Sequence, residues 1–142
     1  PRRAVRPVYA ATASATTAQG AVLDECLAQV LHNAAALCAD APEDPVTLVH
    51  QLRVGMRRLR AALRLFDGWV PPAPPELLEA WRDLFAELGA TRDRDVFDSG
   101  VARALAAAGA PPLNPRTNAP ATQDPRMLMR GAGAQSLLLQ WS

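Results

Sequence analysis

A run of basic residues between His50 and Phe66 is the part of the sequence best suited to bind a charged ligand. It holds five arginines, one histidine and no acidic residue in seventeen positions. On a helix that turns about 100° per residue, all but one of these basic positions fall within a stripe about 80° wide and about 21 Å long. This set is called the basic stripe below and consists of His50, Arg53, Arg57, Arg60 and Arg64. Arg58 points away from the stripe.

The apolar residues of the same run occupy a separate face of the expected helix. They are Leu52, Met56, Leu59, Leu63 and Phe66. Gly55 and Ala62 continue this face, and their small size would allow a close approach of another helix. The pattern therefore predicts an amphipathic helix with one buried side and one cationic side.

Like charges three and four positions apart on a helix repel each other by a few tenths of a kcal/mol per pair. The basic stripe tolerates this repulsion best if a bound anion, or acids from elsewhere in the fold, face it. Arginine presents a planar fork that pairs with phosphate oxygens. A solvated charged face is the alternative interpretation, but such faces usually carry both signs. The single sign favours a binding surface for an extended polyanion.

Several stretches together resemble the CHAD family, the conserved histidine α-helical domain. The His50–Phe66 run resembles the signature of that family, and Glu43-Asp44-Pro45 resembles the acidic turn that precedes it. Leu88–Val96 is similar to its second recurring stretch, and Cys26–Asn33 to its opening helix. The resemblance covers residues 17–109 in the order found in the family.

The resemblance implies an all-α helical bundle that binds inorganic polyphosphate through a basic surface, with some members on polyphosphate granules. Carried over by motif, the implied polyphosphate contacts are His50, Arg53, Arg57, Arg60 and Arg64, followed by Arg58 and Arg92. Asp93 and Asp95, beside Arg92, could instead position the arginines of the stripe. Arg82 is a weaker candidate contact, with a surface ion pair to Glu79 or Asp83 as the alternative.

A full family domain is about twice as long as this chain and has a second basic helix, of which no copy is evident. The chain then corresponds to the first four-helix half, and the second half is either missing or supplied by another subunit, as in a homodimer. Some family members follow a CYTH-type triphosphatase domain, and residues 1–16 are similar to the linker expected there. An accessory role to a triphosphatase and an arginine-faced module for an acidic protein partner are therefore alternatives.

Composition narrows the functional classes. The chain has 142 residues, 49% of them hydrophobic, and a net charge of +1, which suits one modest soluble domain. No serine lies in a nucleophile motif and no histidine has metal-ligand spacing, so we expect no enzyme activity, metal or cofactor. Few aromatic residues accompany the arginines, which makes nucleic acid the less favoured polyanion.

Localisation follows from two further observations. No apolar run approaches the roughly 20 residues of a membrane span, and no secretory signal is visible. If Cys26 and Cys38 lie on one helix, they are about 18 Å apart along it, too far for a disulfide. We expect two buried thiols and a cytoplasmic protein. The family resemblance, in which some members associate with polyphosphate granules, adds such granules as one location.

Turn and cap signals divide the chain into three parts. Residues 1–16 are expected to be an extended linker, 17–109 the helical bundle, and 110–142 a flexible loop with a partial helix that begins the second half. Thr16 or Thr17 should cap the first helix, which should end near residue 39. Asp44 and Pro45 should open the basic helix, and Gly68 should follow it in the left-handed conformation.

The later elements are less sharply marked. A third helix is expected from about residue 75 to 88, with Gly89 as a break or a close packing point. The apolar face of this helix should consist of Leu77, Leu78, Trp81, Leu84, Phe85 and Leu88. Residues 92–108 should form a fourth helix or the second half of a kinked one. Pro- and Asn-rich residues 110–126 predict a loop, and residues 127–141 only weak helix because of Gly131 and Gly133.

Overall fold

The structure is a computed structural model that describes residues 1–39, 42–96, 104, 107–109 and 123–141, with the side chains of 91–96 outside the description. The described residues form the helices α1 (Ala15–Cys38), α2 (Pro45–Leu65), α3 (Pro75–Val96), α5 (Pro125–Arg130) and α6 (Ala132–Trp141). No strand occurs among them; the only β-type pairing there is an isolated bridge between Asp67 and Val70. The predicted all-α helical bundle is confirmed.

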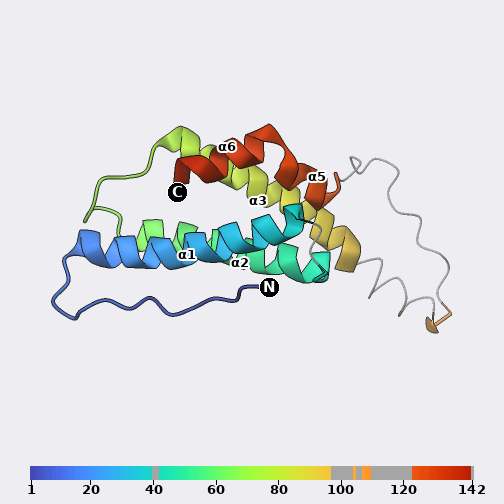
Figure 1. Cartoon of the computed structure of the whole chain (residues 1–142), viewed down its shortest axis with the longest axis horizontal. Helices are drawn as coiled ribbons and strands as arrows, with labels where there is room; N and C mark the ends of the chain where they lie inside the picture. The colour runs from blue at the N-terminus through green and yellow to red at the C-terminus, as the bar shows by residue number, and fades with distance from the viewer. Residues whose placement is uncertain (40–41, 97–103, 105–106, 110–122, 142) are drawn as a thin grey trace.

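The first helix begins earlier than the sequence suggested. The side chain of Ser14 accepts a hydrogen bond from the amide of Thr17 at 3.1 Å, so Ser14 is the N-cap and Thr16 and Thr17 lie inside the helix. The prediction of a threonine cap was wrong because three capping residues lie close together and each could fill the position. Residues 1–13 precede the helix as an extended segment along the α1–α2 hairpin (Figure 1).

The start of the basic helix is as predicted. Asp44 accepts hydrogen bonds from the amides of Val46 and Thr47 at 3.2 and 3.0 Å, and Pro45 is the first helical residue. Such a proline lacks only an N–H that the helix would leave unpaired. Beyond the helix end, Gly68 has φ +77°, a conformation that favours glycine.

The third helix is longer than expected. It runs without interruption from Pro75 through Gly89 to Val96. Of the two interpretations of Gly89, the close packing point is therefore correct, and the break is not. The predicted fourth helix starts inside α3 at residue 92 and continues into residues that lie largely outside the described part of the chain, as does most of the predicted loop at 110–126.

The C-terminal residues are helical rather than weakly ordered. Asp124 caps α5 by accepting from the amide of Arg126 at 2.9 Å, and Gly131 ends this short helix. The glycines that lowered the helical signal lie at the α5–α6 corner and on the exposed side of α6. α5 packs against α1, and α6 packs against α3. The expected boundary after residue 109 thus falls between elements that share one core.

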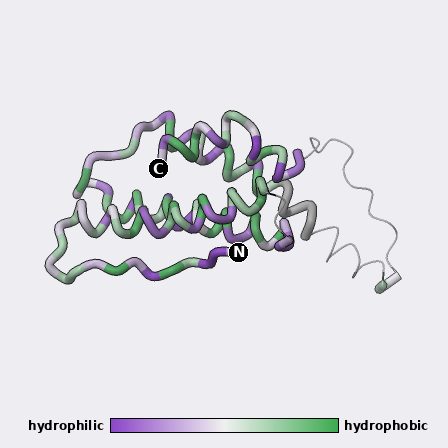
Figure 2. Tube along the Cα trace, in the orientation of Figure 1, coloured by the Kyte–Doolittle hydropathy of each residue, from purple (hydrophilic) through white to green (hydrophobic). Residues whose placement is uncertain are grey.

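The helices form two layers around this core. Figure 1 shows the α1–α2 hairpin as one layer and α3 with α6 as the other, and Figure 2 shows hydrophobic and hydrophilic residues alternating along the helices. Burial of each large apolar side chain stabilises the fold by about 1.5–3 kcal/mol. The most deeply buried apolar residues are Cys26, Val30, Leu37, Leu48, Leu52, Met56, Leu59, Trp81, Leu88 and Met129.

Trp81 connects the two layers. Its indole Nε1 donates a hydrogen bond to the carbonyl oxygen of Met56 at 3.3 Å, and its ring lies 5.4 Å from that of Trp141. One side chain of α3 thereby contacts both α2 and α6. A polar indole N–H can be buried here because it has a partner.

The two cysteines are free, and they differ in exposure. Cys26 is buried, and this burial raises the pKa of its thiol. Cys38 is only half-buried, so the prediction of two buried thiols is right for Cys26 and only partly right for Cys38. Within the described residues, every helix is too short or too polar to cross a membrane.

Gly55 and Gly20 differ in the space around them, so replacing each by alanine should change the stability in opposite directions. A Cβ atom at Gly55 would lie 2.8 Å from Cγ2 of Val30 and 3.3 Å from the carbonyl oxygen of Cys26, whereas one at Gly20 would have no neighbour within 4 Å. Gly55→Ala should lower the free energy of unfolding by about 1 kcal/mol, because overpacking outweighs the gain in helix propensity. Gly20→Ala should raise it by about 0.5–1 kcal/mol. Urea unfolding measures both, and an equal increase in the two variants would contradict the close α1–α2 contact.

The Asp44 cap predicts a pH-dependent part of the stability. The Thr47 hydroxyl, followed by the amides of Val46 and Thr47, holds the pKa of the Asp44 carboxyl below its ordinary value of 3.8. This stabilisation is present above that value and is lost as the pH falls through the lowered pKa. Asp44→Asn retains a capping oxygen but does not titrate, so its stability relative to the parent should improve on acidification. Urea unfolding at several acidic pH values tests this, and a constant difference would contradict it.

Candidate functional site

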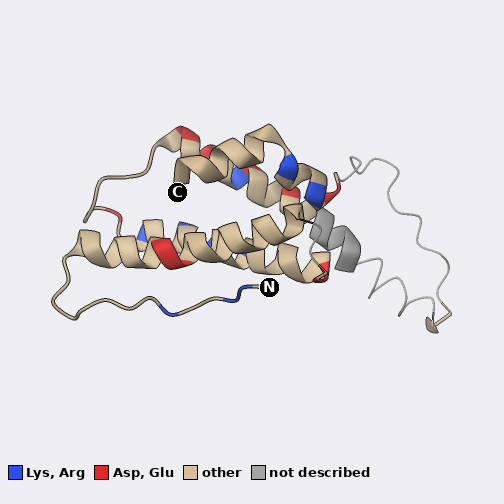
Figure 3. Ribbon diagram, viewed as in Figure 1, with Lys and Arg blue, Asp and Glu red and all other residues tan. Residues whose placement is uncertain are grey.

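The basic stripe lies on the side of α2 that the core does not use. Leu52, Met56 and Leu59 are fully buried, which turns the opposite face of the helix outward. Arg57 and Arg64 are exposed. The sequence of α2 carries only basic charge, whereas α3 carries both signs, which Figure 3 shows as red and blue residues along that helix. The local sequence therefore gives α2 a cationic face without acidic residues of its own.

The Arg53 side chain is held in place by contacts with α3. Its Nη1 donates a hydrogen bond to the carbonyl oxygen of Phe85 at 3.2 Å, and its guanidinium carbon lies 4.3 Å from the centre of the Phe85 ring. A cation above an aromatic ring is attracted by the negative face of the ring. A Cβ atom at Gly89 would lie 3.2 Å from Cζ of Arg53 and closer still to Nη1. Gly89 thus leaves the space that the guanidinium occupies.

These contacts determine how α2 and α3 are arranged. Met56 contacts Trp81, while Arg53, nearer the start of α2, contacts Phe85 and the region of Gly89. The two helices are therefore antiparallel, and the basic stripe follows the seam between them. His50, half-buried in the second turn of α2, lies one turn before Arg53 along the stripe. The backbone of residue 92 belongs to α3, but the predicted contact of the Arg92 side chain lies outside the described residues.

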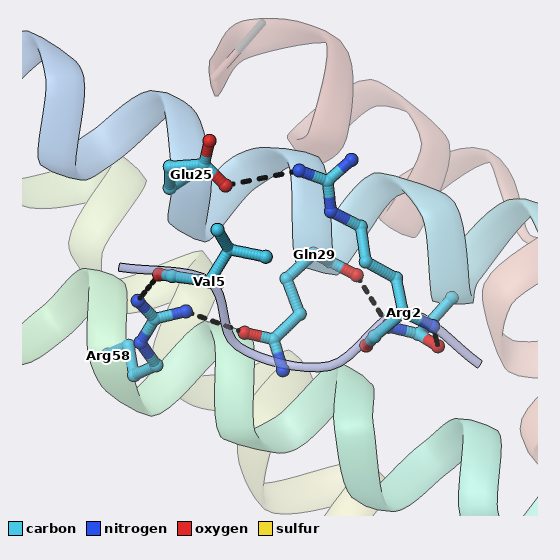
Figure 4. A network of polar contacts seen from close by, with 6 residues as sticks. Arg2, Val5, Glu25, Gln29 and Arg58 are labelled. Atoms are coloured by element: carbon cyan, nitrogen blue, oxygen red, sulfur yellow. Dashed lines mark hydrogen bonds and ion pairs between the residues drawn. The ribbon is translucent and has the colours of Figure 1, made fainter. Parts of the chain in front are cut away.

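Arg58 faces the other way, toward α1. Its Nη1 donates to Oε1 of Gln29 at 2.9 Å, and its Nη2 donates to the carbonyl oxygen of Val5 at 2.7 Å (Figure 4). Arg2 completes this network through an ion pair of 3.1 Å with Glu25. The structure thus brings Arg58 together with the N-terminal segment, not with the basic stripe.

Buried amides keep this network in place. Gln29 and Asn33 on α1 are both fully buried. The Asn33 side chain accepts from the amide of Arg2 at 3.1 Å and donates to its carbonyl oxygen at 2.9 Å. Both halves of the Asn33 amide are therefore satisfied, as a buried polar group requires. The contacts of Arg58 depend on the N-terminal segment, whose residue Val5 lies more than fifty positions away in the sequence. No local sequence pattern predicted this pairing.

The basic stripe ends in a cleft at the far end of α2. Arg60 and Arg64 line it from α2, and Arg82 and Glu79 line it from α3. Its volume is about 590 Å³. Arg82 forms an ion pair of 3.4 Å with Glu79, as the alternative interpretation of that residue predicted. Among the described residues, Arg57, Arg60 and Arg64 form no ion pair.

The arrangement supplies cations and hydrogen-bond donors. No group of three or more side chains able to hold a metal ion occurs in the described part of the chain. What the described residues offer is a row of guanidinium groups that can pair with the oxygens of an extended anion. Sequence reasoning missed the supporting role of Phe85, which it placed only in an apolar face.

Comparison with known proteins gives the family. The sequence-family model of the CHAD domain matches residues 21–141 of this chain. A crystal structure of the CHAD domain from the plant Ricinus communis is similar, with a TM-score of 0.71 and 31% sequence identity. That similarity covers 99% of this chain and 50% of the plant chain, so the chain spans about half the length of this relative. No curated protein matches the chain.

The chain therefore belongs to the CHAD domain family. The resemblance seen in the sequence is confirmed, and the matched region extends past residue 109 to include α5 and α6.

Different environments of two stripe arginines predict different effects on stability. Arg53→Ala removes the ring contact and the hydrogen bond to α3, and should lower the free energy of unfolding by about 1–3 kcal/mol. Arg57→Ala removes an exposed side chain from a row of like charges, and should change it by less than about 0.5 kcal/mol. Urea unfolding of both variants under the same conditions measures this. Equal losses would mean that Arg53 does not anchor α3.

Proposed function

We propose that this chain is an inorganic polyphosphate-binding module and that the basic stripe is its binding surface. The observation that carries the proposal is the row formed by Arg57, Arg60 and Arg64 on one face of α2, without an ion pair among the described residues. The chain belongs to the CHAD family, and polyphosphate is the ligand that the family resemblance of the sequence implies. The geometry supports an extended anion, and the family supports this particular one.

Electrostatics favours a long anion over a small one. The repulsion along the stripe is relieved at each arginine only if negative charge follows the helix for several turns. A single carboxylate would neutralise one position, whereas a phosphate chain presents one charge after another. Guanidinium forks can form paired hydrogen bonds to successive phosphate oxygens. The stripe therefore matches a linear polyphosphate in both length and chemistry.

Arg53 contributes to this surface in two ways. Its contact with Phe85 holds α3 beside the stripe, so that the arginines line a seam between two helices. Its charge also adds to the positive potential along that seam. Arg58, bound to Gln29 and Val5, would act by holding the N-terminal segment rather than by touching phosphate.

The proposed role is binding without catalysis. A module of this kind would bring the protein that contains it to polyphosphate, including polyphosphate granules in the cytoplasm. Because the chain spans about half of the plant CHAD domain, the other half of a complete domain would add further contacts and raise the affinity. The half described here already supplies an uninterrupted cationic row.

Binding across a salt series tests the proposal. The chain should bind long-chain polyphosphate, and the affinity should fall with salt as counterion release requires for a polyanion. Arg57→Gln/Arg64→Gln should weaken binding about tenfold or more and reduce the salt dependence by roughly one to two counterions. Arg3→Gln/Arg6→Gln removes the same charge from exposed positions of the N-terminal segment and serves as the matched control. Fluorescence anisotropy with labelled polyphosphate measures both.

Three results would contradict the proposal. One is an equal loss in both double variants, which would indicate only a response to net charge. The second is tighter binding of single-stranded DNA than of polyphosphate at equal charge and salt. The third is phosphate release that the stripe variant abolishes, because it would indicate an enzyme.

A further inference from the structure

The cleft at the end of the basic stripe differs chemically from the stripe itself. Three arginines converge there from two helices: Arg60 and Arg64 from α2, and Arg82 from α3. Two carboxylates, Glu79 and Asp67, also line it. The stripe offers only cations, whereas the cleft offers cations together with hydrogen-bond acceptors.

The connector between α2 and α3 crosses the end of the seam. It joins the last turn of α2 to the first turn of α3, and Pro71, Pro72 and Pro75 line the cleft. Proline fixes one backbone dihedral, so three prolines within five residues make a stiff wall. A linear anion that follows the stripe toward Arg64 meets this wall.

The last phosphate of a linear chain has a feature that interior phosphates lack. It carries a second titratable oxygen, with a pKa of about 6 for comparable phosphate esters. When that oxygen is charged, it adds negative charge for an additional arginine. When it is protonated, it is a donor for a carboxylate. Interior phosphates have only one charge and no donor, so they offer neither a second charge to an additional arginine nor a hydrogen bond to Glu79 or Asp67.

From this match we propose that the cleft binds the terminal phosphate of a polyphosphate chain. Arg60 and Arg64 continue the stripe to the chain end, and Arg82 closes on that end from α3. The ion pair with Glu79 holds Arg82 at the cleft in the absence of ligand. The side chains of both residues are more than half exposed, at 58% and 68%, so Arg82 can turn from Glu79 to a phosphate without unpacking the core. This inference rests on the proposed polyphosphate binding and specifies where its chain end lies.

Blocking the chain ends tests the inference. The ligand is a short linear polyphosphate, just long enough to span the stripe, compared with the same chain converted at both ends to the methylamine phosphoramidate. The protein should bind the unblocked polyphosphate about tenfold more tightly than the blocked one, because the blocked ends lack a charge-assisted hydrogen-bond partner. Arg82→Gln should bring that ratio close to one while leaving binding through the stripe. Arg3→Gln, with the same change of charge, should keep the ratio.

The outcomes distinguish recognition of the chain end from polyphosphate binding as such. Equal binding of blocked and unblocked chains by the parent protein would overturn end recognition and leave polyphosphate binding in place. A preference that survives Arg82→Gln would overturn the assignment to this cleft. Failure of the folded protein to bind either chain would overturn both, with circular dichroism showing that each variant is helical.

Discussion

Burial of one face of α2 is the constraint on which the rest of the molecule depends. Leu52, Met56 and Leu59 must enter the core, because α2 is the helix that packs against both α1 and α3. With a period of about 3.6 residues, Arg57, Arg60 and Arg64 then share the outer face. Their mutual repulsion is a cost that the buried face offsets, since each buried apolar side chain contributes about 1.5–3 kcal/mol. A row of like charges of this kind requires a helix that is otherwise strongly anchored.

The arginines of α2 have three distinct roles even though they belong to one short run. Arg53 joins α2 to α3 through the Phe85 ring and the space above Gly89. Arg58 joins α2 to the N-terminal segment through Val5. The remaining arginines of the run, which form no ion pair among the described residues, are available to a ligand. Two structural arginines therefore position the surface that the others form.

The sequence predicted the features that depend on local order along the chain. The stripe, the Asp44 cap and the apolar face of α3 followed from helical periodicity and capping chemistry. The partners of Arg58 could not be predicted, because Val5 approaches it only after the N-terminal segment has folded back along the hairpin. α5 and α6 were also underestimated, since their helices are short and Gly131 and Gly133 lower the local propensity. Packing on α1 and α3 stabilises them, which is tertiary information.

In the proposed complex, a polyanion lies along the outer face of α2. The most direct test is an NMR titration of the arginine Nε–H signals of isotope-labelled protein with polyphosphate. The signals of Arg57, Arg60 and Arg64 should shift together, while those of Arg58 and Arg130, which donate to backbone carbonyl oxygens of Val5 and Cys38, should stay in place. Shifts confined to the N-terminal segment, or spread equally over all arginines, would contradict the claim.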